Sequence, residues 1–375
     1  MASHLFIGLM SGTSLDGVDA VLADFSAMPG RLLAAHRHAF PADLRAELLA
    51  LQRPGANELH RAALAANDLA RVYAAAVESL LAQSGLSPAE VRAAGVHGQT
   101  VRHRPESGYT LQLNAPALLA ELCGIDVVHD FRGRDVAAGG QGAPLVPAFH
   151  AAVFGDSEAR AVVNIGGIAN VTLLPGARGG EVAGHDCGPG NVLLDLWTER
   201  HLGAPFDRDG AWAAQGRSIA ALLEVFLSEP YFSTPPPKST GRDLFHEGWL
   251  GERLRAWRGH EEPVSGTEAR DVQATLAELT VETIARAIEG AHEGPGEIIV
   301  CGGGAFNTHL MALLARRCAP CTVLSSIERG IAPDHVEALA FAWLAREHVL
   351  GRPGNVPSVT GARGERVLGS RTPRS

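Results

Sequence analysis

Residues 8–17, Gly-Leu-Met-Ser-Gly-Thr-Ser-Leu-Asp-Gly, join two short apolar segments at 4–10 and 18–25. We predict that the two segments are strands and that this stretch is the turn between them. The turn is not a Walker A loop, because no Gly-Lys-Ser/Thr follows and no helix is predicted there. It is not a nucleophile elbow, because the pattern Gly-x-Ser-x-Gly is absent from it. The remaining alternatives are a plain polar turn and a phosphate-binding hairpin.

The composition of this turn favours phosphate binding. Small residues such as Gly12 let a backbone approach a ligand closely, and successive amides can point at phosphate oxygens. Ser11, Thr13 and Ser14 add hydroxyl donors, and Asp16 adds a carboxylate suited to a metal shell or a sugar hydroxyl. A plain two-residue hairpin turn needs only Asn-Gly or a similar pair. The longer run of small and polar residues exceeds that need.

A second hairpin repeats the same plan later in the chain. The predicted strand 161–165 is followed by Gly166-Gly167 and by a second predicted strand at 170–174. A polar break at 154–157 precedes it. We therefore predict two domains, 1–155 and 156–350, whose small-residue hairpins grip a polyphosphate and its metal from both sides of a cleft. Residues 351–375 are rich in Gly, Pro and Arg and are predicted to form a loosely attached tail.

Strand and helix patterns alternate along the whole chain, which indicates an α/β protein. Helices are predicted at 57–84, 115–123, 190–202, 212–227, 268–289, 307–317 and 334–348, and further strands at 92–97, 125–129, 297–301 and 322–325.

Length and composition restrict the class of protein. The chain has 375 residues, of which 46% are hydrophobic and 19% charged, so it can build a core. The net charge of -9 argues against a nucleic-acid partner. No apolar stretch approaches the roughly 20 residues of a membrane span. The N-terminus has no basic region of the kind that opens a signal peptide. We predict a cytoplasmic protein with neither a nucleic-acid nor a membrane partner.

The five cysteines do not suggest a disulfide framework. Cys318 and Cys321 are spaced like a redox or metal motif. They follow a predicted helix instead of opening one, and no second pair completes a zinc site. The structural interpretation is favoured, and the sequence itself defines no metal ligands.

Several other residues carry possible chemistry. Gly302-Gly303-Gly304 joins a predicted strand to a helix and either holds adenosine or phosphate or only allows close packing. Asp186 precedes a Gly-Pro-Gly-Asn turn that opens a helix, so it is either a reactive carboxylate or a helix N-cap.

Two short segments have the residues of a sugar site. Arg132 and Arg134 bracket a glycine, and a guanidinium fork suits a carboxylate, although surface charge is the alternative. His97 and Gln99 follow a predicted strand and are either sugar ligands or structural residues.

Taken together, these segments resemble the anhydro-N-acetylmuramic acid kinase family over almost the whole chain. The string Met-Ser-Gly-Thr-Ser-Leu-Asp-Gly-Val-Asp at 10–19 is highly specific. Further matches, in family order, lie at 96–100, 111–114, 130–147, 164–170, 186–191, 237–242, 301–307 and 337–345. Cys187 departs from the pattern, where a small hydroxyl residue such as Thr is expected.

The resemblance implies a two-domain actin-like ATPase with a ribonuclease H-like fold and an interdomain cleft. It implies that 1,6-anhydro-N-acetylmuramic acid, ATP and water give N-acetylmuramic acid 6-phosphate and ADP during peptidoglycan recycling. Asp186 would be the general base, Mg2+ would accompany ATP, and a homodimer is plausible. The implied ATP- and phosphate-binding residues are Gly12, Thr13, Ser14, Leu15, Asp16, Gly17, Val18, Asp19, Gly166, Gly167, Gly302, Gly303, Gly304 and Asn307. The implied substrate-binding residues are His97, Gln99, Arg132 and Glu337.

Two rival functions are considered. A plain sugar kinase of the same architecture would phosphorylate a hydroxyl without opening a ring. A chaperone-like or cytoskeletal nucleotide switch would need a peptide-binding domain or a polymer interface. The chain leaves no room for an added peptide-binding domain after the ATPase core.

Overall fold

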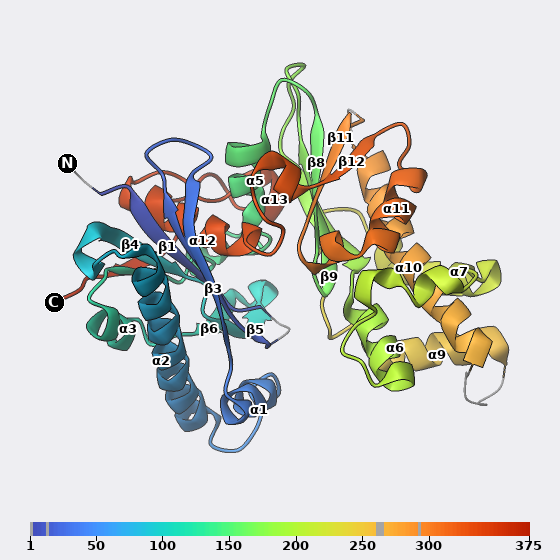
Figure 1. Cartoon of the computed structure of the whole chain (residues 1–375), viewed down its shortest axis with the longest axis horizontal. Coiled ribbons are helices and arrows are strands. Elements are labelled where there is room, and N and C mark those ends of the chain that lie inside the picture. Colours follow the sequence, from blue (N-terminus) through green and yellow to red (C-terminus); the bar gives the residue numbers. More distant parts are fainter. Residues whose placement is uncertain (1–2, 13–14, 260–265, 292–293) are drawn as a thin grey trace. The chain divides into compact units, whose positions relative to one another are not determined.

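A computed structural model of the chain describes residues 3–12, 15–259, 266–291 and 294–375 (Figure 1). The chain forms two compact units. Unit 1 consists of Met1–Val153 and His335–Ser375, and unit 2 consists of Phe154–Asp334. This division differs from the predicted one at the C-terminal end, where the last helix and the tail belong to unit 1.

Unit 1 is built on a six-stranded sheet with the order β13-β7-β4-β1-β2-β3. Strand β2 is antiparallel to β1 and to β3, whereas β4 is parallel to β1 and β7 is parallel to β4. A separate hairpin pairs β5 with β6. The strands are β1 (Leu5–Met10), β2 (Gly17–Asp24), β3 (Arg31–Ala39), β4 (Val91–Val96), β5 (Gln99–Arg104), β6 (Tyr109–Leu113), β7 (Val127–His129) and β13 (Ser370–Thr372).

Unit 2 is built on a five-stranded sheet with the order β10-β9-β8-β11-β12. Strand β9 is antiparallel to β8 and to β10, whereas β11 is parallel to β8 and β12 is parallel to β11. The strands are β8 (Arg160–Ile165), β9 (Ile168–Leu174), β10 (Ala183–Pro189), β11 (Glu297–Cys301) and β12 (Thr322–Ser325).

The two sheets share one topology. Counted along the chain among the strands of each main sheet, the order is third, second, first, fourth and fifth, and β13 adds an edge strand in unit 1. The first three strands form an antiparallel meander, and the last two extend the sheet in parallel on its other side. This order is that of the ribonuclease H-like fold found in actin-like ATPases. The predicted α/β class and duplicated architecture are confirmed, and the predicted cleft stays a prediction.

Helices surround both sheets. Those of unit 1 are α1 (Ala42–Ala50), α2 (Glu58–Ser84), α3 (Pro116–Cys123), α4 (Gly133–Ala137), α12 (Val336–Val349) and α13 (Pro357–Thr360), and α5 (Val146–Phe154) leads into unit 2. Those of unit 2 are α6 (Val192–Leu202), α7 (Ala220–Leu227), α8 (Pro230–Ser233), α9 (Glu247–Arg258), α10 (Gly266–Glu289) and α11 (Thr308–Arg317).

Helices α2 and α12 cover opposite faces of the unit 1 sheet (Figure 1). Ile7 of β1 belongs to the buried cluster that includes the apolar side of α2. The next residue, Gly8, points to the other face, where an added Cβ would lie 1.9 Å from Ala338 O of α12. A Cβ on Gly95 of β4 would lie 2.1 Å from Phe341 O. The two glycines therefore let the backbone of α12 approach the sheet closely.

The C-terminal segment is packed against unit 1, in contrast to the loosely attached tail predicted from its composition. Buried Asp135 accepts hydrogen bonds from Asn355 Nδ2 at 2.7 Å and from Thr360 Oγ1 at 2.8 Å. Strand β13 pairs antiparallel with β7, and Arg371 forms an ion pair with Asp126. This Gly-, Pro- and Arg-rich segment is therefore ordered, because specific hydrogen bonds and an ion pair hold it on unit 1 although it has no continuous apolar face.

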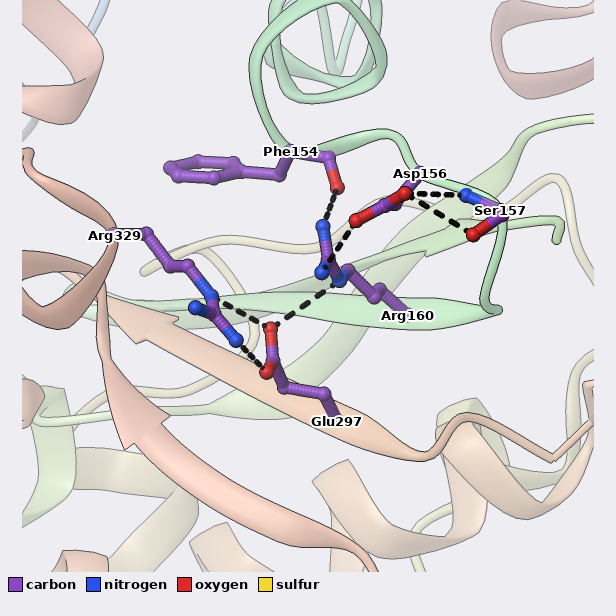
Figure 2. Close-up of polar contacts among 6 residues, drawn as sticks. All are labelled: Phe154, Asp156, Ser157, Arg160, Glu297 and Arg329. Atoms are coloured by element: carbon purple, nitrogen blue, oxygen red, sulfur yellow. Dashed lines mark hydrogen bonds and ion pairs between the residues drawn. The ribbon is translucent and has the colours of Figure 1, made fainter.

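An ion-pair network joins the end of α5 to the first residues of β8 and β11 (Figure 2). The Arg160 guanidinium lies 2.9 Å from Asp156 Oδ2 and 3.3 Å from Glu297 Oε1. It also donates to Phe154 O at 3.0 Å. Glu297 accepts from Arg329 Nε at 3.0 Å. The side chains of Arg160 and Glu297 at the centre of the network are each only 15% exposed, whereas Asp156 and Arg329 at its ends are open to solvent.

Within the ranges that the structure describes, no helix combines the length and the apolar character needed to cross a membrane.

Candidate active site

The turn after β1 is tied to the start of β5. Ser11 is fully buried, donates through Oγ to Gly98 O at 2.9 Å and lies 2.8 Å from the Tyr73 hydroxyl. Gln99 Nε2 donates to Gly12 O at 3.2 Å. The structure therefore brings together Gly12 and Gln99, which come from separate predicted segments. Ser11 has a structural role here, because its hydroxyl is used inside the fold.

The predicted phosphate-binding residues of this hairpin have different environments. Thr13 and Ser14 lie outside the described residues. The side chains of Leu15 and Val18 are buried in the core of unit 1, so only their backbones remain for a ligand. A Cβ on Gly17 would lie 2.3 Å from a carbonyl oxygen of β3, so this glycine serves the packing of the hairpin.

Acidic residues of the first hairpin and of α12 interact with two arginines, Arg37 and Arg132. Asp16 and Asp19 each lie 3.6 Å from the Arg37 guanidinium. Burial and the Asp19 carboxylate raise the pKa of Glu337, whereas the Arg132 guanidinium acts in the opposite direction. Glu337 therefore interacts electrostatically with Asp19 and with Arg132, although these residues are far apart in the sequence.

Arg132 is held in position by His97. Its Nη2 and Nε lie 2.9 and 3.3 Å from His97 Nε2, and its Nη1 donates to Gly142 O at 2.8 Å. Burial and the adjacent guanidinium lower the pKa of His97 to about 3, so the imidazole is neutral near pH 7. His97 Nδ1 lies 3.0 Å from Ser11 O. The neutral ring therefore carries its proton on Nδ1, donates to Ser11 O and accepts from Arg132 through Nε2.

Buried histidines make the stability of the fold sensitive to acid. Burial lowers the pKa values of His97 and His150 from 6.5 to about 3, and that of His185 from 6.5 to about 4. The unfolded chain binds more protons than the folded chain between these values and 6.5, so stability is lost as the pH falls through that window. Each histidine contributes a slope of up to about 1.4 kcal/mol per pH unit.

Urea unfolding between pH 7.5 and pH 4.5 measures this effect. We expect the free energy of unfolding of the wild type to fall on acidification, and that of His97→Gln to fall less steeply. An identical pH dependence of the two proteins would contradict the buried neutral state of His97.

In unit 2, Gly166 and Gly167 form the turn between β8 and β9. Asn191 N donates to Gly166 O at 2.8 Å, and Val192 N donates to Gly167 O at 3.1 Å, which holds the turn against the start of α6. A Cβ added to either glycine would meet no atom of the described chain nearer than 3.5 Å. The packing of the protein therefore does not require glycine here, which leaves room for a ligand to approach the turn.

The three glycines after β11 differ in the space around them. Gly302 has a φ of +77°, and a Cβ there would lie 2.3 Å from Asn164 Oδ1. A Cβ on Gly304 would lie 2.3 Å from Ile165 Cγ2. These two glycines are needed for close packing on β8, as the structural alternative proposed. A Cβ added to Gly303 would lie no nearer than 3.6 Å to any atom of the described chain, so this glycine is the member of the triplet with space for a ligand.

Two further predictions concern residues near the ends of α11. Asn307 is the N-cap of this helix, and its Oδ1 accepts from Leu310 N at 3.0 Å, so its side chain already has a structural contact. Cys318 lies at the other end, and burial raises the pKa of its thiol to about 11. A thiol with a raised pKa is a poor nucleophile and metal ligand, which favours the structural interpretation of this cysteine.

Asp186 lies within β10 and not at the start of a helix. The alternative prediction that it caps a helix is wrong, because the N-cap of α6 is Asn191. Asp186 Oδ2 accepts a hydrogen bond from Thr240 N at 3.0 Å, and Asp186 O accepts one from the Tyr231 hydroxyl at 2.8 Å. The loop after α8 therefore holds the carboxylate of Asp186, and Tyr231 of α8 holds its backbone.

Asp186 is part of a polar row across the unit 2 sheet. Asp186 pairs with Asn170 on β9, and Asn170 pairs with Asn164 on β8. Residues paired in this way project from the same face. Sequence reasoning assigned no role to Asn164, Asn170 or Thr240. The available signal was the presence of asparagine in strands that are otherwise apolar.

Known proteins resemble this chain over nearly its full length. The sequence profile of the family described as anhydro-N-acetylmuramic acid kinase matches residues 4–374. An anhydro-N-acetylmuramic acid kinase of Cupriavidus pinatubonensis is 58% identical over 375 residues, which cover 98% of each chain. One of Bordetella parapertussis is 58% identical over 371 residues, which cover 99% of this chain and 96% of the relative.

Among solved structures, the activator of the 2-hydroxyisocaproyl-CoA dehydratase from Clostridium difficile with bound ADPNP has a TM-score of 0.46 at 13% identity, covering 92% of this chain and 96% of that one. A similarity at this level carries no conclusion about function. The matches to the profile and to the relatives, by contrast, extend over nearly the full length of this chain, and residues 4–374 span Asp186 and both hairpins. The chain belongs to the anhydro-N-acetylmuramic acid kinase family.

Proposed function

We propose that this protein is an ATP-dependent kinase that opens the anhydro bridge of 1,6-anhydro-N-acetylmuramic acid and phosphorylates O6. The products are N-acetylmuramic acid 6-phosphate and ADP. The observation that carries this proposal is the family match over residues 4–374. We further propose that the enzyme acts in the cytoplasm in peptidoglycan recycling and forms a homodimer.

Asp186 is proposed as the general base. A water molecule attacks the anomeric carbon and gives its proton to the Asp186 carboxylate while the bond from C1 to O6 breaks. O6 takes the electron pair of that bond and attacks the γ-phosphorus, and ADP leaves. Ordinary glycoside hydrolysis needs a second carboxyl group to protonate the leaving oxygen. Here the phosphoryl group captures the charge of that oxygen, so one base suffices.

The two glycine-containing turns are proposed to bind ATP. Phosphoryl transfer depends mainly on positioning and on neutralisation of charge. Mg2+ in such sites usually takes one or two protein carboxylates and completes its shell with phosphate oxygens and water. Asp16 and Asp19 suit such an ion, because both carboxylates lie within 3.6 Å of one guanidinium and are therefore close together. When bound, the ion would neutralise charge on the phosphates.

The sugar is proposed to contact unit 1 through His97, Gln99, Arg132 and Glu337. Arg132 is the best candidate for the lactyl carboxylate of the sugar, because His97 and Gly142 already fix its guanidinium. A positioned guanidinium loses little conformational freedom when it binds a carboxylate.

Product analysis in 18O-labelled water tests the reaction. We expect one ADP per sugar consumed and one solvent oxygen at C1 of the phosphorylated product. Unlabelled product incubated in the same water corrects for exchange at the anomeric carbon. A phosphorylated sugar that keeps its anhydro bridge would instead identify the rival plain sugar kinase, and ATP turnover independent of sugar would contradict both.

Substitution of Gly167 tests the role of the second hairpin. Gly167→Val is expected to raise the KM for ATP about tenfold or more without lowering the melting temperature, because the added side chain meets the ligand and not the protein. Gly304→Ala is the matched control and is expected to lower the melting temperature, because its Cβ would lie 2.3 Å from Ile165. Unchanged ATP kinetics in Gly167→Val would remove this turn from the nucleotide site.

A further inference from the structure

Asn170 presents an unsatisfied polar atom beside Asp186. The two residues are directly paired on β9 and β10, so their side chains project from the same face of the sheet. Their chain neighbours Val171 and Cys187 belong to the hydrophobic core of unit 2, so the pair faces away from that core. Asn170 Oδ1 is shielded from solvent and has no hydrogen-bond partner within the described ranges.

A second unsatisfied atom, the hydroxyl oxygen of Thr240, belongs to a residue that bonds the same carboxylate. Its backbone N–H donates to Asp186 Oδ2 at 3.0 Å. Its hydroxyl oxygen is shielded from solvent and finds no partner in the part of the chain that the structure describes. Only Cα and Cβ separate the amide nitrogen of a threonine from its hydroxyl, so the hydroxyl is held near Asp186 as well.

Among the described residues, no hydrogen bond joins Asn170 Oδ1 to the Thr240 hydroxyl. Asn170 Oδ1 accepts and does not donate, and the oxygens of the neighbouring Asp186 carboxylate are acceptors too, so Asn170 Oδ1 needs a donor from elsewhere. An unsatisfied buried polar group destabilises the fold, and native proteins seldom keep such groups without a use. A water molecule has two donors and two lone pairs, which matches two acceptors and one hydroxyl.

We propose that Asn170 and Thr240 complete the site that holds the attacking water at Asp186. This proposal rests on the proposed function. The water donates one hydrogen to the Asp186 carboxylate and the other to Asn170 Oδ1, and it accepts a hydrogen bond from the Thr240 hydroxyl. Its remaining lone pair forms the bond to C1, its first hydrogen passes to Asp186, and the electrons of the C1–O6 bond leave with O6. Asn170 and Thr240 therefore orient the nucleophile while Asp186 takes the proton.

Isosteric substitutions separate this role from a structural one. Thr240→Val removes the hydroxyl and keeps the shape and the backbone N–H. We expect kcat to fall about tenfold, the worth of one hydrogen bond, with both KM values and the melting temperature unchanged. Thr240→Ser restores the hydroxyl and is expected to restore most of kcat. Thr234→Val is the control, because Thr234 lies in the same loop and its hydroxyl bonds Pro230 O at 3.3 Å.

Asn170→Leu is expected to lower kcat in the same way, because leucine has a similar shape and no oxygen. In an Asp186→Asn background, Thr240→Val should lower kcat by a smaller factor than it does in the wild type, because the water is no longer activated. Three results would each overturn the water site. They are a wild-type kcat in Thr240→Val, a kcat in Thr240→Ser as low as that in Thr240→Val, and effects of Thr240→Val and Asp186→Asn on kcat that multiply fully. A wild type without sugar-dependent ADP formation would instead overturn the proposed function.

Discussion

Asp186→Asn is expected to lower kcat by about 10²–10⁴, the usual contribution of a positioned general base. Asparagine keeps the shape of the side chain and retains an oxygen that accepts from Thr240 N, which lies 3.0 Å from Asp186 Oδ2. It cannot accept the proton of water. The loss should appear in kcat and not in KM, because the proton moves only in the transition state. Steady-state kinetics with ATP and the anhydro sugar measure both constants.

A second aspartate of unit 2 provides the control. Asp207 accepts hydrogen bonds from Trp212 N and Ala213 N, both at 2.9 Å, so its carboxylate has a purely structural role. Asp207→Asn is expected to change stability more than kcat. A near-normal kcat in folded Asp186→Asn would refute the mechanism even though the family assignment stands.

Arg132→Ala is expected to raise the KM for the anhydro sugar about 10- to 150-fold, with ATP affinity little changed. This range corresponds to about 1.5–3 kcal/mol for a hydrogen bond to a charged group. Anhydro-N-acetylglucosamine lacks the lactyl carboxylate, so the variant should lose its preference for the muramic substrate. The measured quantity is the ratio of kcat/KM for the two sugars.

The choice of substrates also controls for damage to the fold. Arg132 donates to His97 and Gly142, so its removal leaves their acceptors unpaired and destabilises this part of unit 1. Such damage would affect both sugars alike and leave their ratio unchanged. Arg134→Ala, on an exposed side chain two residues away, is expected to behave as the wild type. If Arg132→Ala still prefers the muramic sugar as the wild type does, the carboxylate binds elsewhere.

Elements with a strong local pattern were predictable from the sequence. The predicted strands at 4–10, 18–25, 161–165 and 297–301 correspond to β1, β2, β8 and β11, and the predicted helix at 57–84 corresponds to α2. Each of these has either a continuous buried apolar run or a long helical period. Glycine between apolar segments was also enough to locate both hairpin turns.

Other elements were missed because neighbouring segments decide their conformation. Strand β10 contains Gly, Asp and Pro, which are rare in strands, and it is extended because it pairs with β9 as an edge strand. A helix was predicted over 212–227, but α7 begins only at Ala220. Residues Ala213–Gln215 form only a short 3-10 turn, which ends at Gly216. A Cβ on Gly216 would lie 2.4 Å from Arg270 O, so α10 packs closely against the chain at this point.

The sequence by itself determined the α/β class, the repeated hairpin plan and the family, because these depend on local patterns and on long specific strings. Only the tertiary structure decided what each residue contacts. It assigned Gly302 and Gly304 to packing and left space at Gly167 and Gly303. It also placed Asn170 and Thr240 beside Asp186, from positions separated by 16 and 54 residues in the chain. Such contacts are set by strand register and loop return, and no local pattern in the sequence records them.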